Sequence, residues 1–338
     1  MYIVDDTLDD LLRRVLVRIF ARGERIVASR GTNLELCGVL LQLRNPRARL
    51  SRSADRGRIF SGLGELLWYL SKSDRLDFIK YYIAKYEEES DDGVTLYGAY
   101  GPRLFLKGGW NQFDAVRTLL TSKPTTRRAV IQLFDSSDLK PPAKKEIPCT
   151  CTLQFLVRQG QLDLVATMRS NDAYIGLPHD VFTFTMLQEL MARTLGHEIG
   201  VYRHFIASLH IYDRDWQKAR AYVRQGWQPV AGAAMPPMPL GDPWPAVSRL
   251  LAAEESIRAN TFDWAADLGE SDYWADLIRL LGVLSAFKRR EKSQMQDLRK
   301  AMKSKVYDMY IARRQAAAAS KEAEQGEFNF QNQKPPIE

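Results

Sequence analysis

The residues with the greatest chemical potential lie between Cys149 and Asp180. Cys149 follows a proline and opens an apolar stretch, so its thiol could act as a nucleophile. About twenty residues later, Arg169-Ser170 could hold a phosphate through the paired donors of a guanidinium group. Asp180 follows a Gly-Leu-Pro turn, where a carboxyl group could read the edge of a base. This order predicts a site that binds a nucleotide and attacks its base.

Helix and strand patterns alternate along residues 1–225, which must position these groups. Apolar residues at helical spacing predict helices, and alternating or β-branched runs predict strands. Helices are expected at 9–20, 64–79 and 182–195, and strands at 34–43, 129–134, 149–157, 162–167 and 202–212. The turn at 158–161 makes a hairpin of the strands on either side of it, which brings Arg169 back toward Cys149.

The remainder of the chain has a different composition. Six prolines and three glycines in 226–245 predict a linker, and helices are expected at 246–257, 274–287 and onward to about 319. The domains predicted are therefore a catalytic domain at 1–225, the linker, a helical extension at 246–320 and a polar tail at 321–338 without fixed structure.

The positive charge is concentrated in the extension. Residues 288–314 hold ten basic and three acidic side chains, an excess that equals the net charge of +7 for the whole chain. A charged run on a helix is usually a solvated face, so nucleic-acid binding is not expected. The charge therefore carries no information about the catalytic part.

Composition also limits the class of protein. With 45% hydrophobic and 26% charged residues, the chain is typical of a soluble globular protein. Its start is acidic, and no apolar run approaches the roughly 18 residues of a membrane span. Three cysteines are too few for a disulfide framework, and none has further ligands at zinc-binding spacing, so we expect a cytoplasmic protein without a metal site.

Two thiols compete for the role of nucleophile. Cys149 and Cys151 alternate along one strand, which predicts that both face the same side. A cysteine in an apolar strand is more often a small core residue than a nucleophile. Pro148 before Cys149, Gln154 five residues after it and the Arg169-Ser170 pair across the hairpin favour Cys149.

These motifs, taken in order, resemble the thymidylate synthase family over about residues 8–222. Pro148-Cys149 is similar to the nucleophile motif of that family, and Glu65, in Gly-Glu-Leu-Leu-Trp, is similar to its buried glutamate. Tyr100-Gly101 and His210-Ile211-Tyr212 match two further motifs. The resemblance implies an α/β (α+β) fold, with a mixed sheet flanked by helices, here followed by a helical C-terminal extension.

The resemblance also implies roles for individual residues. Arg30, Arg127, Arg128 and Arg169 would bind the 5′-phosphate, with Arg127 and Arg128 reaching the site of a partner subunit in a homodimer. The co-substrate would be 5,10-methylenetetrahydrofolate, contacted by Asp172 and Trp68. The catalytic residues would be Cys149, Glu65, Tyr100 and Asp180, and the other nucleotide-binding residues Gln154, Ser170, Asp172, His210 and Tyr212.

The chain departs from the family in ways that affect substrate and product. Asp180 stands where the synthases have asparagine, which indicates cytosine in place of uracil. Residues 81–86 replace a tryptophan-rich segment, and nothing after residue 225 resembles the closing C-terminal tail. Without these elements, water should reach the reactive intermediate, and the product should be hydroxymethylated.

Three hypotheses follow for the function. The first is folate-dependent 5-hydroxymethylation of a cytidine nucleotide monophosphate, with dCMP preferred over CMP as the expected substrate. The second is a thymidylate synthase that methylates dUMP. The third is a non-catalytic relative that binds nucleic acid or a partner protein through the basic helix at 288–314.

Overall fold

The computed structural model describes residues 1–28, 30–52, 58–229, 232–266 and 268–318. The chain divides into two compact units, Met1–Leu251 and Ala252–Glu338. Among the residues described, no helix combines the length and the apolar character needed to cross a bilayer.

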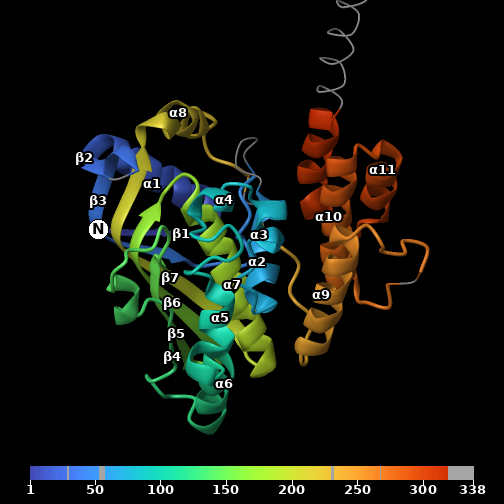
Figure 1. Ribbon diagram of the computed structural model, residues 1–338, viewed down its shortest axis with the longest axis horizontal. Helices are drawn as coiled ribbons and strands as arrows, with labels where there is room; N and C mark the ends of the chain where they lie inside the picture. The colour runs from blue at the N-terminus through green and yellow to red at the C-terminus, as the bar shows by residue number, and fades with distance from the viewer. Residues whose placement is uncertain (29, 53–57, 230–231, 267, 319–338) are drawn as a thin grey trace, which may run out of the picture. The chain divides into compact units, whose positions relative to one another are not determined.

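A seven-stranded mixed sheet organises the first unit (Figure 1), as the sequence predicts. Six strands follow the order β1-β3-β7-β6-β5-β4, and the seventh, β2, also pairs with β3. β1 pairs in parallel with the end of β3, whereas β2 forms an antiparallel hairpin with its beginning. The strands are β1 (Tyr2–Asp5), β2 (Glu24–Ala28), β3 (Gly31–Leu43), β4 (Val130–Gln132), β5 (Thr150–Arg158), β6 (Gln161–Asp172) and β7 (Glu198–Tyr212).

The centre of the sheet carries the predicted hairpin. β5 and β6 pair antiparallel across Gln159-Gly160, whose φ angles of 50° and 75° suit the tight turn between twisted strands. β6 and β7 pair in parallel, and helix α7 (Gly176–Thr194) connects them. The loop before β5, the end of β6 and the start of α7 therefore supply the residues that the sequence singles out.

Helices cover one face of the sheet. Leu162, Leu164 and Ala166 alternate along β6 and are completely buried on that face. α1 (Leu8–Arg22) and α7 pack directly on the strands, α2 (Ile59–Leu70) packs on α7, and α5 (Tyr100–Phe105) packs on α2. Figure 1 shows α7, α2 and α5 grouped beside the strands of this unit.

The opposite face of the sheet is less covered and includes apolar side chains among polar ones. Leu156 on β5 and Val165 on β6 are half-buried, and Phe205 on β7 is 39% exposed. Their neighbours in sequence, which point to the helical layer, are buried. The sheet thus presents a second surface suited to contact with another protein surface.

The single helix predicted at 64–79 is two helices. α2 ends at Leu70 and α3 (Leu76–Tyr82) begins six residues later. Between them Lys72 adopts a φ of 61°, which ends a helix, and the backbone of Leu76 donates to Val94. Pairing with the 94–96 segment therefore separates the two helices.

The shorter elements of this unit are α4 (Tyr86–Glu89), η1 (Lys107–Gly109), α6 (Gln112–Ser122), η2 (Ser136–Leu139), η3 (Asp213–Asp215) and α8 (Trp216–Arg224).

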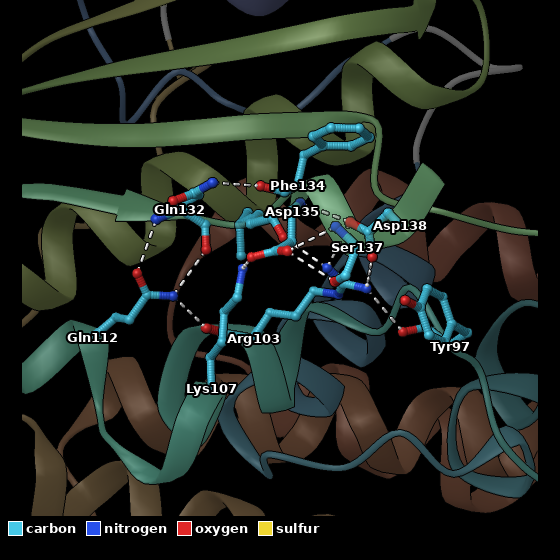
Figure 2. Close-up of polar contacts among 10 residues, drawn as sticks. Tyr97, Arg103, Lys107, Gln112, Gln132, Phe134, Asp135, Ser137 and Asp138 are labelled. Atoms are coloured by element: carbon cyan, nitrogen blue, oxygen red, sulfur yellow. Dashed lines mark hydrogen bonds and ion pairs between the residues drawn. The ribbon is translucent and has the colours of Figure 1, made fainter. Parts of the chain in front are cut away.

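A buried arginine fixes α5 to the strand layer (Figure 2). Both terminal nitrogens of Arg103 bond the carboxylate of Asp138, at 2.9 and 2.7 Å, and Nη1 also donates to the carbonyl of Leu133. The Asp138 side chain is almost fully buried, and Arg103 holds its pKa below the ordinary value despite the burial. This paired fork anchors the helix that begins with Tyr100.

The segment predicted as a linker is packed in its described part. α9 (Trp244–Arg258) begins within it, and Met235 and Met238 are buried. The backbone N–H of Met238 donates to Glu189, a buried carboxylate of α7. The two units divide at residue 251, inside α9, and the domain boundaries drawn from the sequence stay predictions.

The second unit is helical, but its basic stretch is not one helix. α10 (Asp272–Arg289) ends at Arg290, whose φ is 65°, and α11 (Lys292–Ala301) is followed by η4 (Lys305–Tyr307) and a helix at 308–318. The buried carboxylate of Asp276 accepts the backbone N–H groups of Lys303 and Ser304, which fixes this second break. The predicted polar tail at 321–338 lies outside the described residues.

We expect Asp138→Ala to lower the free energy of unfolding by about 3 to 5 kcal/mol, because it leaves a buried guanidinium unpaired. Asp114→Ala is the matched control, since Asp114 pairs with Arg117 on an exposed helix face. The control should cost about 1 kcal/mol or less. Urea denaturation followed by tryptophan fluorescence measures both, and equal losses would contradict the structural role given to Arg103.

Candidate active site

Cys149 lies directly before β5 and is held from two directions. Its carbonyl accepts the backbone N–H of Arg169 at 2.9 Å, which ties it to β6. On the other side, the hydroxyl of Tyr100 donates to Thr150 Oγ1 at 2.9 Å and accepts from Thr150 N at 3.1 Å. Tyr100, on α5, therefore helps to fix the position of Cys149 through its hydrogen bonds to Thr150.

A β-bulge separates the two thiols. Thr150 pairs with Met168 and Thr152 pairs with Thr167, so Cys151 is an additional residue in β5. The bulge interrupts the simple alternation on which the shared face of Cys149 and Cys151 was predicted, so that shared face stays a prediction. Thr150, beside Cys149, points to the buried helical side of the sheet.

The surroundings of Cys149 favour the neutral thiol in the free protein. Burial raises the pKa of Cys149 to about 11, against the effect of the Arg169 and Arg30 charges, which lower it. The carboxyl groups of Asp180 and Glu146 raise the same pKa further. The structure thus brings Cys149, Arg169, Arg30 and Asp180 together, as expected for one site.

The two arginines near Cys149 are already engaged by the loop that precedes it. Arg169 donates to the carbonyls of Pro148 and Ile147 at 3.0 and 3.1 Å. Arg30 lies in the turn between β2 and β3, pairs with Glu89 at 2.6 Å and donates to the carbonyl of Lys145. A bound phosphate would compete with Glu89 for Arg30.

The other two predicted phosphate ligands lie elsewhere in this chain. Arg127 and Arg128 precede β4 and are exposed. In the part of the chain that the structure describes, neither guanidinium group forms an ion pair. Gln154 donates to the carbonyl of Arg127 at 2.9 Å, so this predicted nucleotide ligand is bound to the β4 edge.

Glu65 is a buried acid on α2. It is 6% exposed, and the hydroxyl of Tyr86 donates to its Oε1 at 2.7 Å. Burial raises the pKa of Glu65 to about 7, although hydrogen bonds from Tyr86 and Tyr69 oppose that shift. Near neutral pH this carboxyl can therefore both give and accept a proton.

Asp180 lies in α7 and is the most strongly perturbed carboxyl of the site. Burial raises its pKa well above the ordinary value, and the charge of Glu65 adds to the effect. A hydrogen bond from the side chain of Asn171 opposes it. This environment therefore favours the protonated form of Asp180, which could donate one hydrogen bond and accept another.

The ends of β6 and β7 complete the site. Asp172 Oδ1 accepts the N–H groups of Tyr174 and Ile175 at 2.7 and 3.0 Å, which shapes the turn into α7. His210 lies opposite Asp172 in the strand register, and its ring is 5.0 Å from that of Tyr212. Burial raises the pKa of Tyr212, and the charges of Asp172 and Cys149 raise it further, so these strand ends adjoin the thiol. Ser170, next to Arg169 on β6, is half-buried.

Trp68, a predicted folate contact, is 2% exposed and packs against Tyr69 and Tyr86. Its ring therefore offers little surface to a ligand. Its Nε1 is buried and has no hydrogen-bond partner among the described residues. This orphaned donor, beside Glu65 on α2, is the feature of the structure that fits a polar co-substrate here. The contact of Trp68 with the folate stays a prediction.

Several residues at this site escaped the sequence-based prediction. Tyr86 and Tyr69 bond Glu65, Asn171 bonds Asp180, and Glu146 acts on the charge of Cys149. Tyr86 belongs to the 81–86 segment that departs from the family, and Glu146 lies three residues before the nucleophile. Their closeness in the sequence to the predicted motifs was the available signal. Only the packing of the chain shows that they belong to the same site.

Comparisons with known proteins agree with this geometry. The family described as thymidylate synthase matches residues 56–236, more than half of the chain. A deoxyuridylate hydroxymethyltransferase of Delftia phage PhiW-14 is 26% identical over 299 residues, which cover 83% of this chain and 82% of the relative.

Other relatives match over shorter regions. A deoxyuridylate hydroxymethyltransferase of Bacillus phage SP01 is 31% identical over 60% of this chain and 56% of its own length. A thymidylate synthase of Bacillus phage phi3T is 30% identical over 44% of this chain and 54% of its own. These matches show that the chain belongs to the thymidylate synthase family, enzymes that transfer a one-carbon unit from methylenetetrahydrofolate to a pyrimidine nucleotide.

Proposed function

We propose that this protein hydroxymethylates C5 of a cytidine nucleotide monophosphate, with dCMP preferred over CMP. The observation that carries the proposal is the environment of Asp180 at the start of α7, which raises the pKa of its carboxyl group and so favours the protonated form. Cytosine presents an acceptor at N3 and a donor at its 4-amino group, which a carboxylic acid matches by donating and accepting. The three free cysteines support a cytoplasmic location.

Each predicted site residue has a task in this reaction. The Cys149 sulfur adds to C6 of the base, which makes C5 nucleophilic. Arg30 and Arg169 bind the 5′-phosphate, His210 and Tyr212 the sugar, and Glu65 exchanges protons at the base. Methylenetetrahydrofolate supplies the one-carbon unit when bound, and Asp172 and Trp68 would hold it.

A second candidate substrate is dUMP. The relatives named above include proteins called deoxyuridylate hydroxymethyltransferase. A neutral carboxyl group can also accept from N3–H of uracil and donate to O4, with its proton on the other oxygen.

The hydroxymethyl product is supported by the polar surroundings of Glu65. In the segment that replaces the tryptophan-rich one, Tyr86 directs its hydroxyl group at Glu65, and Tyr82 packs on Gly64. A side chain at Gly64 would lie 2.1 Å from the Tyr82 ring, so the segment is closely fitted to α2. Hydroxyl and carboxyl groups at this place favour bound water over the dry enclosure that hydride transfer requires.

A homodimer would complete the phosphate site. The half-covered sheet face carrying Leu156, Val165 and Phe205 offers an apolar surface for a second copy. Arg127 and Arg128 are exposed and unpaired within one described chain, so they are available to a partner subunit.

Substrate and product can be tested together. We expect the protein, incubated with methylenetetrahydrofolate, to convert dCMP better than CMP and dUMP to a product heavier by one hydroxymethyl group, without forming dihydrofolate. Asp180→Asn should shift the ratio of kcat/KM for dCMP and dUMP toward dUMP by at least about a hundredfold, because an amide matches uracil. Mass spectrometry identifies the product, and absorbance reports dihydrofolate. Better turnover of dUMP by the unchanged protein would refute the cytosine assignment.

Subunit mixing tests the nucleophile and the dimer. Cys149→Ala and Arg127→Ala should each lose turnover, and equal mixing should restore roughly a quarter of the native activity, because half the dimers contain one intact site. Cys151→Ala is the matched control and should remain active. No recovery in demonstrated mixed dimers would show that each subunit builds its own site, and loss only in Cys151→Ala would identify the other thiol.

The raised pKa of Glu65 predicts a pH-dependent stability. The folded protein holds this proton more tightly than the unfolded chain, so the stabilisation is present below pH 4.5 and is lost as pH rises toward 7. Glu65→Gln cannot ionise. Its free energy of unfolding, relative to that of the native chain, should therefore increase by up to about 3 kcal/mol between pH 4.5 and 7. Urea denaturation from pH 5 to 8 measures this. Glu87→Gln, on an exposed helix face, is the control, and a pH-independent difference for Glu65→Gln would contradict the prediction.

A further inference from the structure

Glu146 is a second acid beside the nucleophile that has no role in the scheme above. It precedes Cys149 by three residues and is half-buried. The backbone N–H of Gly98 donates to its carboxylate. A Cβ at Gly98 would lie 2.1 Å from Glu146 Oε2, so the carboxylate occupies the space next to a glycine that cannot be replaced without moving it. The fold therefore determines the position of Glu146.

The loop is held on both sides of Glu146. Lys145 donates its backbone N–H to Asp91 and its Nζ to the carbonyl of Ser90, at 3.3 and 2.7 Å. Arg30 donates to the carbonyl of Lys145, and Arg169 binds the two carbonyls that follow Glu146. These contacts fix the backbone of the loop on both sides of Glu146, three residues before Cys149.

Glu146 and Glu65 share one electrostatic environment. The charge of Glu146 raises the pKa of Glu65, of Tyr86 and of Cys149. The charged and titratable groups that face Glu146 come from α2, α4, α5, the β2–β3 turn and its own loop: Glu65, Tyr86, Glu89, Arg103, Arg30 and Cys149.

The two acids differ in their partners. Arg103 and Arg30 both favour the ionised form of Glu146, although burial and Glu89 raise its pKa. The groups that oppose the raised pKa of Glu65 are the hydroxyls of Tyr86 and Tyr69, which are neutral donors. Since two neighbouring carboxyl groups resist double ionisation, these partners favour the proton on Glu65 and the charge on Glu146.

Hydroxymethylation requires a proton acceptor at a defined step. Water forms a bond from its oxygen to the exocyclic CH₂ carbon at C5, and the electrons of the C5=CH₂ bond move into the ring. They return to form C5=C6 as the C6–S bond breaks and the Cys149 thiolate leaves. The water gives up one proton, no group is oxidised or reduced, and a carboxylate beside the thiol is the natural acceptor.

We propose that Glu146 is the base that receives this proton and thereby directs the intermediate to the hydroxymethyl product. The proposal rests on the hydroxymethylase function proposed above and adds a residue specific to its last step. Earlier steps, including loss of the C5 proton, use Cys149 and Glu65 and do not require Glu146.

The test separates the last step from the earlier ones. The native protein, Glu146→Gln and the control Glu87→Gln are incubated with methylenetetrahydrofolate, 2-mercaptoethanol and either dCMP or dUMP tritiated at C5. Tritium release reports formation of the intermediate. Mass spectrometry gives the ratio of hydroxymethyl product to the thioether formed when the added thiol captures the intermediate.

For Glu146→Gln we expect tritium release within about threefold of native and a fall of at least roughly a hundredfold in the ratio of hydroxymethyl product to thioether. Glu87→Gln should match the native protein. Gly98→Ala displaces the carboxylate without removing it and should change this ratio in the same direction. This variant provides the test if Glu146→Gln does not fold.

The outcomes distinguish this role from the function on which it rests. A native ratio in Glu146→Gln or in Gly98→Ala, with hydroxymethylation by the native protein, would overturn the role of Glu146 alone. Equal losses of tritium release and product would make Glu146 structural and would also overturn it. Dihydrofolate formation by the native protein, or no tritium release from either nucleotide, would overturn the hydroxymethylase function and this role together.

Discussion

Burial of acidic groups around one thiol is the constraint on which this site depends. Glu65, Asp180 and Glu146 lie close enough for their charges to act on one another, and burial raises the pKa of each. Every pKa unit corresponds to about 1.4 kcal/mol, so ionising all three acids together is strongly unfavourable. The site therefore favours protonated carboxyl groups, and in the proposed reaction the distribution of those protons would decide which group can donate to a base and which can accept from water.

The scaffold holds these groups with contacts that are separate from the chemistry. Arg103 fixes α5 through Asp138, and α5 in turn places Tyr100 against Thr150. The β6 strand fixes the other side of Cys149 through the backbone of Arg169.

Family membership and substrate choice have different physical origins here. The sheet, the nucleophile loop and the glutamate of α2 place the chain in the thymidylate synthase family. In the proposed function, the choice of base would depend on the carboxyl group of Asp180, and the choice of product on the surroundings of Glu65. Relatives that share the fold but carry different names illustrate how few atoms separate these activities.

The sequence by itself predicted the fold class, five of the seven strands and the order of the motifs, because periodicity and local motifs are short-range properties. It also predicted that Arg30, Arg169 and Asp180 would meet Cys149. It missed the break at Lys72 and the interruptions of the basic helix, since backbone pairing with 94–96 and the carboxylate of Asp276 act over long separations. Only the tertiary structure could place Cys151 in a bulge, bury Trp68 and bring Tyr86 and Glu146 to Glu65. Burial and mutual charge decide those pKa values, and both arise only when segments distant in sequence pack together.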